Sequence, residues 1–372
     1  MRVALLLAGP ATAPRGSQVL VRQLALGLAE RGHVVRLVTY GGRRAGPPGP
    51  RVGRLLSDLW LTGRLWRLVA REPIDVVHAH NYEAAIAGLV VARLTGRPLV
   101  YHGHSALAEE LPLYFTNPLV RRLAARLGRS LDAQVPRRAD FCIAVTDELG
   151  ALLRRRGVTA AGLACIGPAG TPEELGPPPA PGGDGGLVCY AGNLDGYQNL
   201  GFLLRAFARV QARVPGARLV LVTHADGRAA ARLVGHVRGV EVIRAGSYDE
   251  VRARLAAAAI AVCPRAERSG FPMKLLNYMA AGKAIVASAG SAKGLEDGVT
   301  GRVVPDGDEA AFADAIVALL GDARERERLG LAARRAAESR DAWDAVLDRI
   351  EAIYRHVTAQ GEPRLVPVAC PE

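Results

Sequence analysis

Residues 261–288 read AVCPRAERSGFPMKLLNYMAAGKAIVAS. The apolar run over residues 259–263 predicts a buried strand, which ends at Pro264. Residues 273–280 have the apolar spacing of a helix, and residues 284–287 form a second apolar run. A strand, a glycine-containing turn, a helix and another strand make a βαβ unit. This stretch therefore predicts a parallel sheet covered by helices.

The start of the 273–280 helix is a candidate anion site. Backbone N–H groups in the first turn of a helix lack helical partners, and they suit a phosphate. Of 48 lysines and arginines only Lys274, Lys283 and Lys293 are lysines, which leaves 45 (48 − 3) arginines. A compact ammonium is not interchangeable with a planar guanidinium. Lys274, in the first turn, is therefore the predicted phosphate contact, whereas Lys283 and Lys293 fit a solvated face equally well.

The rest of the chain repeats this α/β alternation. A length of 372 residues with 49% hydrophobic residues is enough for two domains, each with its own core. We predict an N-terminal domain over residues 1–170, a Gly- and Pro-rich linker over 171–186 and a C-terminal domain over 187–340. Residues 341–360 would form a C-terminal helix that could return to the first domain. Ligands of such sheets bind beyond the strand ends, so a cleft between two facing, doubly wound domains is the expected site.

Charge is unevenly distributed along the chain. Residues 1–180 hold 23 arginines and 13 acidic residues (+10), and residues 181–372 hold 25 basic and 23 acidic residues (+2). The first half should therefore face a negatively charged partner. A membrane surface or an anionic lipid substrate fits better than nucleic acid, because no basic–aromatic interleaving occurs.

Two predicted helices bear on membrane association. The helix over residues 119–131 has leucines on one face and arginines around the rest, and a second helix carries Trp60 and Trp66. Such helices either lie on an anionic membrane surface or pack on the sheet with their arginines exposed. No run of eighteen uncharged apolar residues predicts a membrane span. The five cysteines form no CxxC pair, which predicts free thiols in a reducing compartment. We expect a cytoplasmic protein that either stays free or associates peripherally with the inner face of the cell membrane.

The order of motifs resembles the GT-B glycosyltransferases, specifically the large retaining family 4 group, over nearly the whole chain. The matching pieces are GSQVLVRQLALGLAERGHVVRLVTY, DVVHAHNYEAA, YHGHS, YAGNLDGYQNLGFLLRAF, SGFPMKLLNYMAAGKAIVAS and GLEDGVTGRVVPDGD. The resemblance implies an α/β GT-B fold of two Rossmann-like domains. It also implies transfer of a sugar from a UDP- or GDP-linked donor to a glycan or lipid-linked acceptor, without a metal or other cofactor. Such enzymes bind the donor mainly through the C-terminal domain and the acceptor through the N-terminal one.

The donor motif departs from the family pattern. The family's basic pair, Arg then Lys, corresponds here to Asn193 and Gln198, and its two glutamates correspond to Ser269 and Asn277. Glu267 could supply a missing carboxylate, because the loop before Ser269 is slightly longer than usual. Either the donor site is rewired, or the fold is catalytically silent and binds a glycan or a partner. Because the rest of the motif is intact, we favour the rewired transferase. A sugar-nucleotide epimerase is a third hypothesis, but its extra acidic residues are not found.

The resemblance and the patterns together give three groups of candidate residues. The predicted catalytic residues are His104 and Glu267, with His102 as a nearby competitor of His104. The predicted acceptor side is the polar cluster His80, Asn81, Tyr82 and Glu83, for which helix capping is an equal alternative. His104 would bind the donor sugar or the acceptor, or only fix its loop, and Asn277 would pair with the ribose hydroxyls. The predicted donor contacts are Gly16, Asn193, Gln198, Ser269, Gly270, Phe271, Pro272, Lys274, Leu275 and Asn277.

Asp306-Gly307-Asp308 has the DxD form of metal-dependent transferases of a different fold. We predict instead that it turns the chain and caps the helix that follows. No other cluster with metal-ligand spacing is found in the sequence, so no metal site is predicted.

Overall fold

The computed structural model describes residues 1–11, 15–41, 52–170, 184–224, 234–235, 237–266, 270–339 and 343–359. The chain divides into two compact units, and each is described by itself. The N-terminal unit comprises Met1–Pro168, Ser269–Phe271 and the C-terminal segment from Asp344. The C-terminal unit comprises residues 169–268 and 272–343. The predicted cleft between the two units stays a prediction.

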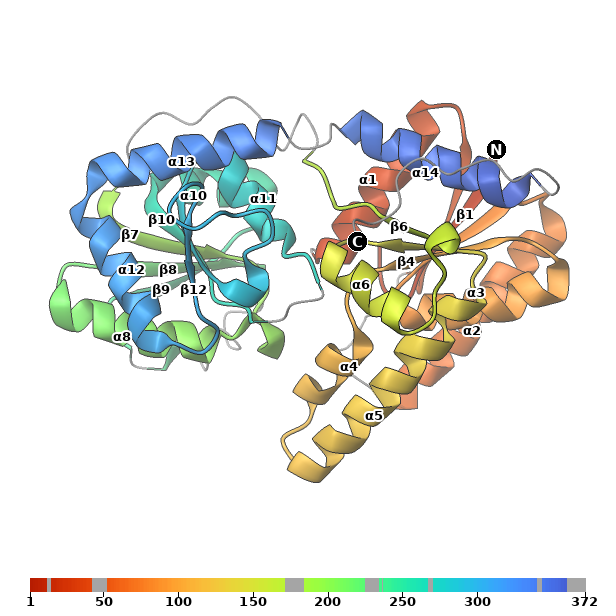
Figure 1. Ribbon diagram of the computed structural model, residues 1–372, viewed down its shortest axis with the longest axis horizontal. Helices are drawn as coiled ribbons and strands as arrows, with labels where there is room; N and C mark the ends of the chain where they lie inside the picture. Colours follow the sequence, from red (N-terminus) through yellow and green to blue (C-terminus); the bar gives the residue numbers. More distant parts are fainter. Residues whose placement is uncertain are drawn as a thin grey trace. The chain divides into compact units, whose positions relative to one another are not determined.

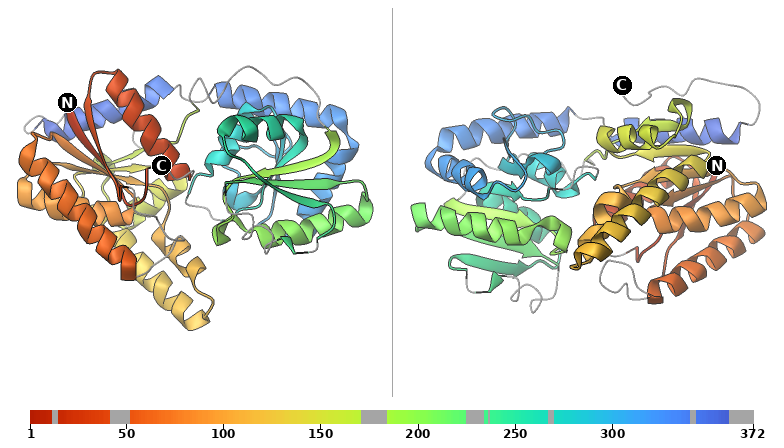
Figure 2. Two further views of the ribbon diagram at one scale, coloured as in Figure 1. Left: turned by 180° about the vertical axis from the view of Figure 1, so that it is seen from behind. Right: turned by 60° about the horizontal axis from the view of Figure 1, so that its bottom comes forward.

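The N-terminal unit is a six-stranded parallel sheet in the order β2-β1-β3-β4-β5-β6, with helices on both faces (Figures 1 and 2). Its central strands are buried along their length, as expected for parallel strands covered on both faces. The strand order reverses between β1 and β3, and ligands of such sheets bind beyond the strand ends at that point. The strands are β1 (Arg2–Leu7), β2 (Val34–Val38), β3 (Val76–His80), β4 (Leu99–Gly103), β5 (Phe141–Ala144) and β6 (Leu163–Cys165).

Seven helices belong to this unit in the described part of the chain. They are α1 (Gly16–Glu30), α2 (Val52–Arg71), α3 (Tyr82–Thr95), α4 (Leu107–Glu110), α5 (Pro118–Gln134), α6 (Asp147–Arg155) and the C-terminal α14 (Trp343–Thr358). Thr146 caps α6, because its side chain accepts a hydrogen bond from the Leu149 amide.

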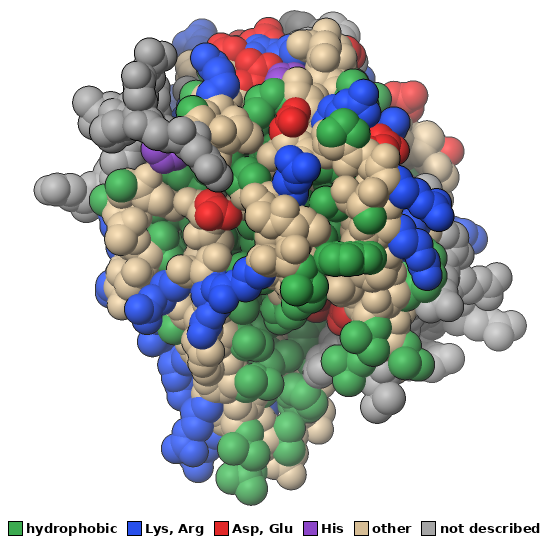
Figure 3. All heavy atoms as spheres, turned by 90° about the vertical axis from the view of Figure 1, so that its right-hand side faces the viewer, with side chains coloured by type: hydrophobic (Ala, Val, Ile, Leu, Met, Phe, Trp, Pro, Cys, Tyr) green, Lys and Arg blue, Asp and Glu red, His purple; other side chains and the backbone are tan. Residues whose placement is uncertain are grey.

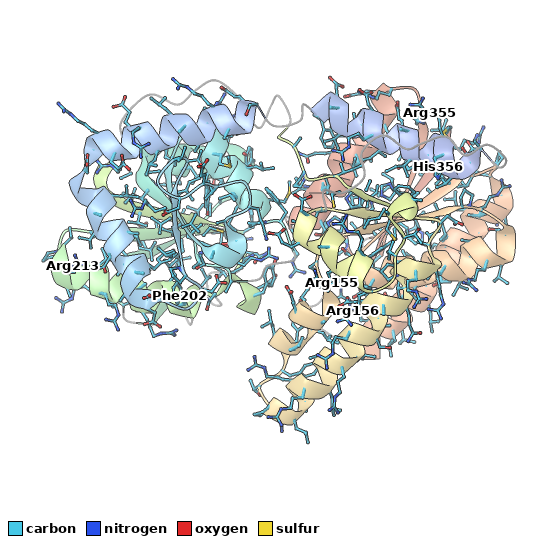
Figure 4. All side chains as sticks on the ribbon, in the orientation of Figure 1. Arg155, Arg156, Phe202, Arg213, Arg355 and His356 are labelled. Carbon is cyan, nitrogen blue, oxygen red and sulfur yellow. The ribbon has the colours of Figure 1, made fainter. Side chains whose placement is uncertain are left out.

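Helix α14 packs on the N-terminal unit, far from its neighbours in the sequence. Arg31, the residue that follows α1, forms ion pairs with Asp344 at 2.9 Å and Asp348 at 2.5 Å. The His356 ring meets Phe141 edge-on at a centroid distance of 5.9 Å, and Figure 4 labels His356 on this helix. The last helix therefore covers the sheet of the first unit.

The C-terminal unit is a second parallel sheet, in the order β12-β11-β10-β7-β8-β9. The order reverses between β7 and β10, which are hydrogen-bonded neighbours. Its strands are β7 (Asp184–Ala191), β8 (Arg218–Thr223), β9 (Val240–Arg244), β10 (Ala258–Cys263), β11 (Ala284–Ser288) and β12 (Arg302–Val304), and its described helices are α8 (Leu200–Arg213), α10 (Tyr248–Ala257), α11 (Met273–Ala280), α12 (Glu309–Gly321) and α13 (Ala323–Glu338). The predicted βαβ unit is thus β10, α11 and β11.

Two expectations need correction. The predicted linker ends too late, because residues 184–186 belong to β7, where Asp184 pairs with Ala258 of β10 and forms an ion pair with Arg218. Its remaining residues, 171–183, lie outside the described part. The prediction of free thiols is confirmed for Cys142, Cys189 and Cys263 but is wrong for Cys165, which is disulfide-bonded. Sequence spacing alone does not reveal which cysteines are bonded.

The short strand β6 carried too weak a signal to be predicted, because three residues do not establish a period. None of the described helices is both long and apolar enough to cross a membrane.

Candidate active site

The predicted anion site lies at the point where the second sheet reverses its order. Strand β7 ends at Ala191, and the loop after β10 leads through Gly270, Phe271 and Pro272 into α11. These two strands are neighbours, so their carboxyl ends bring the loops after them together. Ligands of doubly wound sheets bind at this point, and α11 adds its N-terminus to it.

Lys274 is held here by Tyr190 of β7 and by Gln198 of the loop that follows β7. Its Nζ donates hydrogen bonds to the Tyr190 hydroxyl at 2.7 Å and to Gln198 Oε1 at 2.5 Å. The ammonium also lies over the Tyr190 ring, 4.1 Å from its centroid. The structure therefore brings together two predicted donor residues, Lys274 and Gln198, that are 76 positions apart.

Burial changes the acid–base behaviour of this lysine. Removal from water is the main cause that lowers the pKa of Lys274 to about 7, and the nearby charge of Arg265 adds to the lowering. No carboxylate forms an ion pair with Lys274 in the described part of the chain. A lysine that titrates near neutrality can take up a proton when an anion arrives.

Gly192 makes room for the Lys274 side chain. A Cβ at Gly192 would lie 2.9 Å from Lys274 Nζ and 3.1 Å from the Tyr190 hydroxyl. Any larger residue would displace the end of the lysine side chain. Steric space therefore explains why the YAGN motif has a glycine at this position.

Asn193 organises the loop after β7. Its Nδ2 donates to the Tyr197 hydroxyl at 2.9 Å, its Oδ1 accepts from the Asp195 amide at 3.3 Å, and its carbonyl accepts from the Tyr190 hydroxyl. The Arg265 guanidinium stacks on the Tyr197 ring, 5.1 Å from its centroid. Two cations, Lys274 and Arg265, thus border the loop where the family carries its Arg and Lys.

The other predicted donor residues have mixed placements. Asn277 Oδ1 accepts a hydrogen bond from the Tyr248 hydroxyl at 3.0 Å. Leu275 has its side chain in the core, and its amide donates to the Pro272 carbonyl at 2.8 Å, so that amide is already used within the helix start. Gly16 begins α1 in the N-terminal unit, while Ser269 and the predicted catalytic Glu267 lie outside the described residues.

Lys283 has a structural role. Its Nζ donates to the carbonyls of Ala256 at 2.7 Å and Ala258 at 2.9 Å, and burial lowers its pKa. It therefore joins the end of α10 to β10 and is not part of the donor group.

His104 follows directly on the end of β4 in the N-terminal unit. Its Nε2 lies 3.1 Å from His80 Nδ1, and burial lowers its pKa to about 4. The imidazole is therefore neutral at pH 7, as a hydrogen-bonding role requires. His102, the competitor, is only 2% exposed, whereas His104 is partly buried. The structure thus favours His104 over His102 as the residue that a substrate can reach.

The predicted acceptor cluster divides in the structure. His80 is fully buried, and the Tyr82 hydroxyl donates to Asp132 at 2.5 Å inside the core, which does not favour an acceptor contact for Tyr82. Asn81 has a positive φ of 73° at the start of α3 and makes no side-chain capping bond, so the capping alternative is wrong for its side chain. Glu83 pairs with Arg54 at 3.4 Å, and burial raises the pKa of its carboxyl.

The DxD sequence behaves as predicted. Asp308 caps α12 by accepting from the Ala311 amide at 2.9 Å, and Gly307 has a φ of 84° in the turn. Asp306 accepts from the Gly290 amide at 2.8 Å. These are structural roles.

Sequence reasoning missed Tyr190, Tyr197, Tyr248 and Arg265. Each lies within or next to a motif, but nothing in the local pattern says that its ring or charge faces Lys274, Asn193 or Asn277. It also missed a cluster of three buried histidines, His78, His80 and His102, since the expectation of no metal-ligand cluster did not consider strand pairing.

Two family models match the chain in the order of its two units. The model described as Glycosyltransferase Family 4 matches residues 14–169, and the model described as Glycosyl transferases group 1 matches residues 185–322. The chain belongs to glycosyltransferase family 4. It is therefore a transferase, and its fold is GT-B, as the sequence resemblance implied.

Among similar proteins is the phosphatidyl-myo-inositol mannosyltransferase of Mycobacterium tuberculosis, 27% identical over 97% of this chain and 98% of the relative. The D-inositol 3-phosphate glycosyltransferase of Kribbella flavida is 28% identical over 77% of this chain and 73% of the relative. The structure is similar to that of sucrose-phosphate synthase from Thermosynechococcus elongatus, with a TM-score of 0.80, 20% identity and coverage of 97% of this chain and 100% of that one.

Proposed function

We propose that this family 4 transferase moves a sugar, with retention and without a metal ion, from a UDP- or GDP-sugar to a lipid-linked or glycan acceptor. The observation that carries the proposal is the Lys274 ammonium, 2.5 Å from Gln198 Oε1 at the strand-order reversal of the C-terminal unit. In the family pattern the position of Gln198 is a lysine. Here the Lys274 ammonium of α11 lies beside Gln198, so a positive charge is still present at this position. This supports a donor site that is rewired and still binds an anion.

The rewired site has the charges that a diphosphate needs. Negative charge develops on the diphosphate as the glycosidic bond to the donor breaks, and preorganised cations stabilise it. Lys274 and Arg265 supply that charge in this proposal, and Gln198 holds the lysine in place. His104, neutral at pH 7, would donate a hydrogen bond to the sugar or the acceptor.

The pH dependence of donor binding tests the lysine's part. The free protein has a Lys274 pKa of about 7, and a bound diphosphate raises that pKa. The contribution of the ammonium is therefore complete below pH 7 and is lost as the pH rises through the higher pKa of the complex. We expect UDP or GDP affinity to fall by up to about tenfold per pH unit above pH 7, measured by calorimetry. The Lys274→Met variant should give a flat profile, and an equally steep profile in that variant would contradict the assignment.

An acceptor at an anionic membrane is supported by the surface of α5. Its apolar residues face outward, with Leu119 64% and Leu123 and Leu127 each 55% exposed. Its buried residues are Ala124, Gly128 and Asp132. The alternative in which this apolar face packs on the sheet is wrong. Figure 3 shows hydrophobic side chains beside Lys and Arg side chains on the projection that α4 and α5 form. The name of each relative refers to a phosphorylated inositol. Together with the exposed apolar face of α5, this leads us to propose an inositol phospholipid as the acceptor.

Replacing Leu119, Leu123 and Leu127 together by Gln tests this acceptor. Each substitution removes about 1.5–3 kcal/mol of free energy that the leucine would gain by burial in the membrane boundary. We therefore expect binding to vesicles that contain phosphatidylinositol, measured by sedimentation, to fall at least tenfold. Transfer from UDP- and GDP-sugars to that lipid should fall in parallel, while UDP affinity stays unchanged. Leu26→Gln, at a site that is 65% exposed on α1, is the matched control. Full vesicle binding by the triple variant would rule out α5 as the contact.

A further inference from the structure

Three histidines lie together where β3 and β4 end. Each of the three residues offers one ring nitrogen, and these nitrogens of His78, His80 and His102 all lie within 4.8 Å of one another. The rings stack, with centroid distances of 4.4 Å between His78 and His80 and 4.9 Å between His80 and His102. Their exposed fractions are 0%, 0% and 2%. The parallel register, in which His80 pairs with His102, brings the two strands' imidazoles together.

The hydrogen bonds around this cluster leave nitrogens without partners. His78 Nδ1 lies 2.6 Å from the Tyr354 hydroxyl of α14, and His80 Nδ1 lies 3.1 Å from His104 Nε2. His80 Nε2 and His102 Nε2 are buried without a hydrogen-bond partner in the described part of the chain. His78 Nε2 lies 3.2 Å from His102 Nδ1. A buried polar atom without a partner costs free energy, so two such atoms in one cluster call for an explanation.

We propose that His78, His80 and His102 bind one divalent transition-metal ion, of the zinc class, through one ring nitrogen each. Neutral imidazole is a ligand for zinc, copper, nickel and cobalt. A zinc–nitrogen bond of about 2.0–2.1 Å places tetrahedral ligands about 3.4 Å apart, so the rings need to approach by about 1.4 Å at most. A water molecule completes the coordination.

The surroundings of the three rings suit this role. Histidines that bind a metal hold their second nitrogen by a hydrogen bond, and Tyr354 and His104 make that bond to His78 and His80. His104, whose ring centroid lies 5.3 Å from that of His80, is only partly buried. These residues belong to the N-terminal unit, so the inference does not depend on donor binding by Lys274.

Titration of the full chain, first stripped with a chelator, tests the site. Co²⁺ is the spectroscopic probe and Zn²⁺ the competitor. We expect one Co²⁺ per chain, visible absorption bands of a four-coordinate ion with nitrogen and oxygen ligands, and displacement by Zn²⁺. A thiolate charge-transfer band would assign the ion to cysteines, and six-coordinate or weak, non-stoichiometric binding would assign it to the surface. Either result overturns the proposal.

Variants separate the three ligands from other histidines. His80→Gln and His102→Gln should each lower Zn²⁺ affinity at least about 100-fold, and Tyr354→Phe, which removes only the outer hydrogen bond, about 10-fold. His33→Gln is the control, because His33 lies in the same unit but bonds to Glu351. Unchanged affinity in a folded His102→Gln or Tyr354→Phe protein would overturn the site. If a variant does not fold, the Co²⁺ titration of the wild-type protein still decides between the outcomes, because it needs no substitution.

Discussion

Lys274→Met should raise the dissociation constant for UDP or GDP at least about 100-fold and leave the fold intact. Charge-assisted hydrogen bonds contribute about 1.5–3 kcal/mol each, and 2.7 kcal/mol is a factor of about 100 in affinity. Lys274→Met removes hydrogen bonds to Tyr190 and Gln198. It also removes a buried ammonium that forms no ion pair within the described residues, and the desolvation cost that this relieves offsets the lost bonds, so the melting temperature should change little. Calorimetry with each nucleotide and a thermal melt give the two readings.

Lys283→Met is the matched control with the opposite expectation. Lys283 donates to two backbone carbonyls that Met leaves without a partner, so we expect about 1–3 kcal/mol less stability and unchanged nucleotide affinity. If both variants lost stability and affinity together, Lys274 would be a structural residue and the proposed donor site would be wrong.

His104→Ala should lower kcat at least about 100-fold with little change in the nucleotide dissociation constant. A positioned group that assists transfer contributes about 10²–10⁴-fold, and the donor site that we propose holds the nucleotide in the C-terminal unit. Steady-state kinetics with the donor that the transfer assay identifies, together with nucleotide binding, measures both quantities.

Two further results bear on His104. Its pKa of about 4 means that it stays neutral above about pH 5, so its titration should not limit kcat between pH 5 and 7. His33→Gln, on a histidine of the same unit that bonds to Glu351, should keep full activity. Unchanged kcat in His104→Ala would leave only a role in fixing the loop after β4.

Local patterns were enough to predict most of the fold. The βαβ unit around α11 follows from apolar runs and a helical period that lie within thirty positions of one another. The two-domain α/β organisation followed because the same alternation repeats after a Gly- and Pro-rich segment, whereas the GT-B fold was implied by the family resemblance. The end of that segment was misplaced, since residues 184–186 look like a turn and become a strand only through pairing with β10.

The site depends on contacts that the sequence does not encode locally. Lys274 meets Gln198 and Tyr190 because β7 and β10 are neighbours, and sheet order cannot be read from a window of residues. The histidine cluster likewise needs the register of β3 against β4. The period of residues 119–131 identified an apolar face correctly, but tertiary packing decided that this face points outward.

The most direct test measures the pKa of Lys274 with and without bound nucleotide. The chain has only three lysines, so protein labelled with ¹³C at the lysine ε-carbon gives three signals, which Lys274→Met and Lys283→Met assign. Titration of the free protein should give a pKa of about 7 for Lys274, and saturation with UDP or GDP should raise it by more than about one unit. A Lys274 pKa that stays the same when the nucleotide saturates the protein would contradict the claim that this ammonium binds the donor diphosphate.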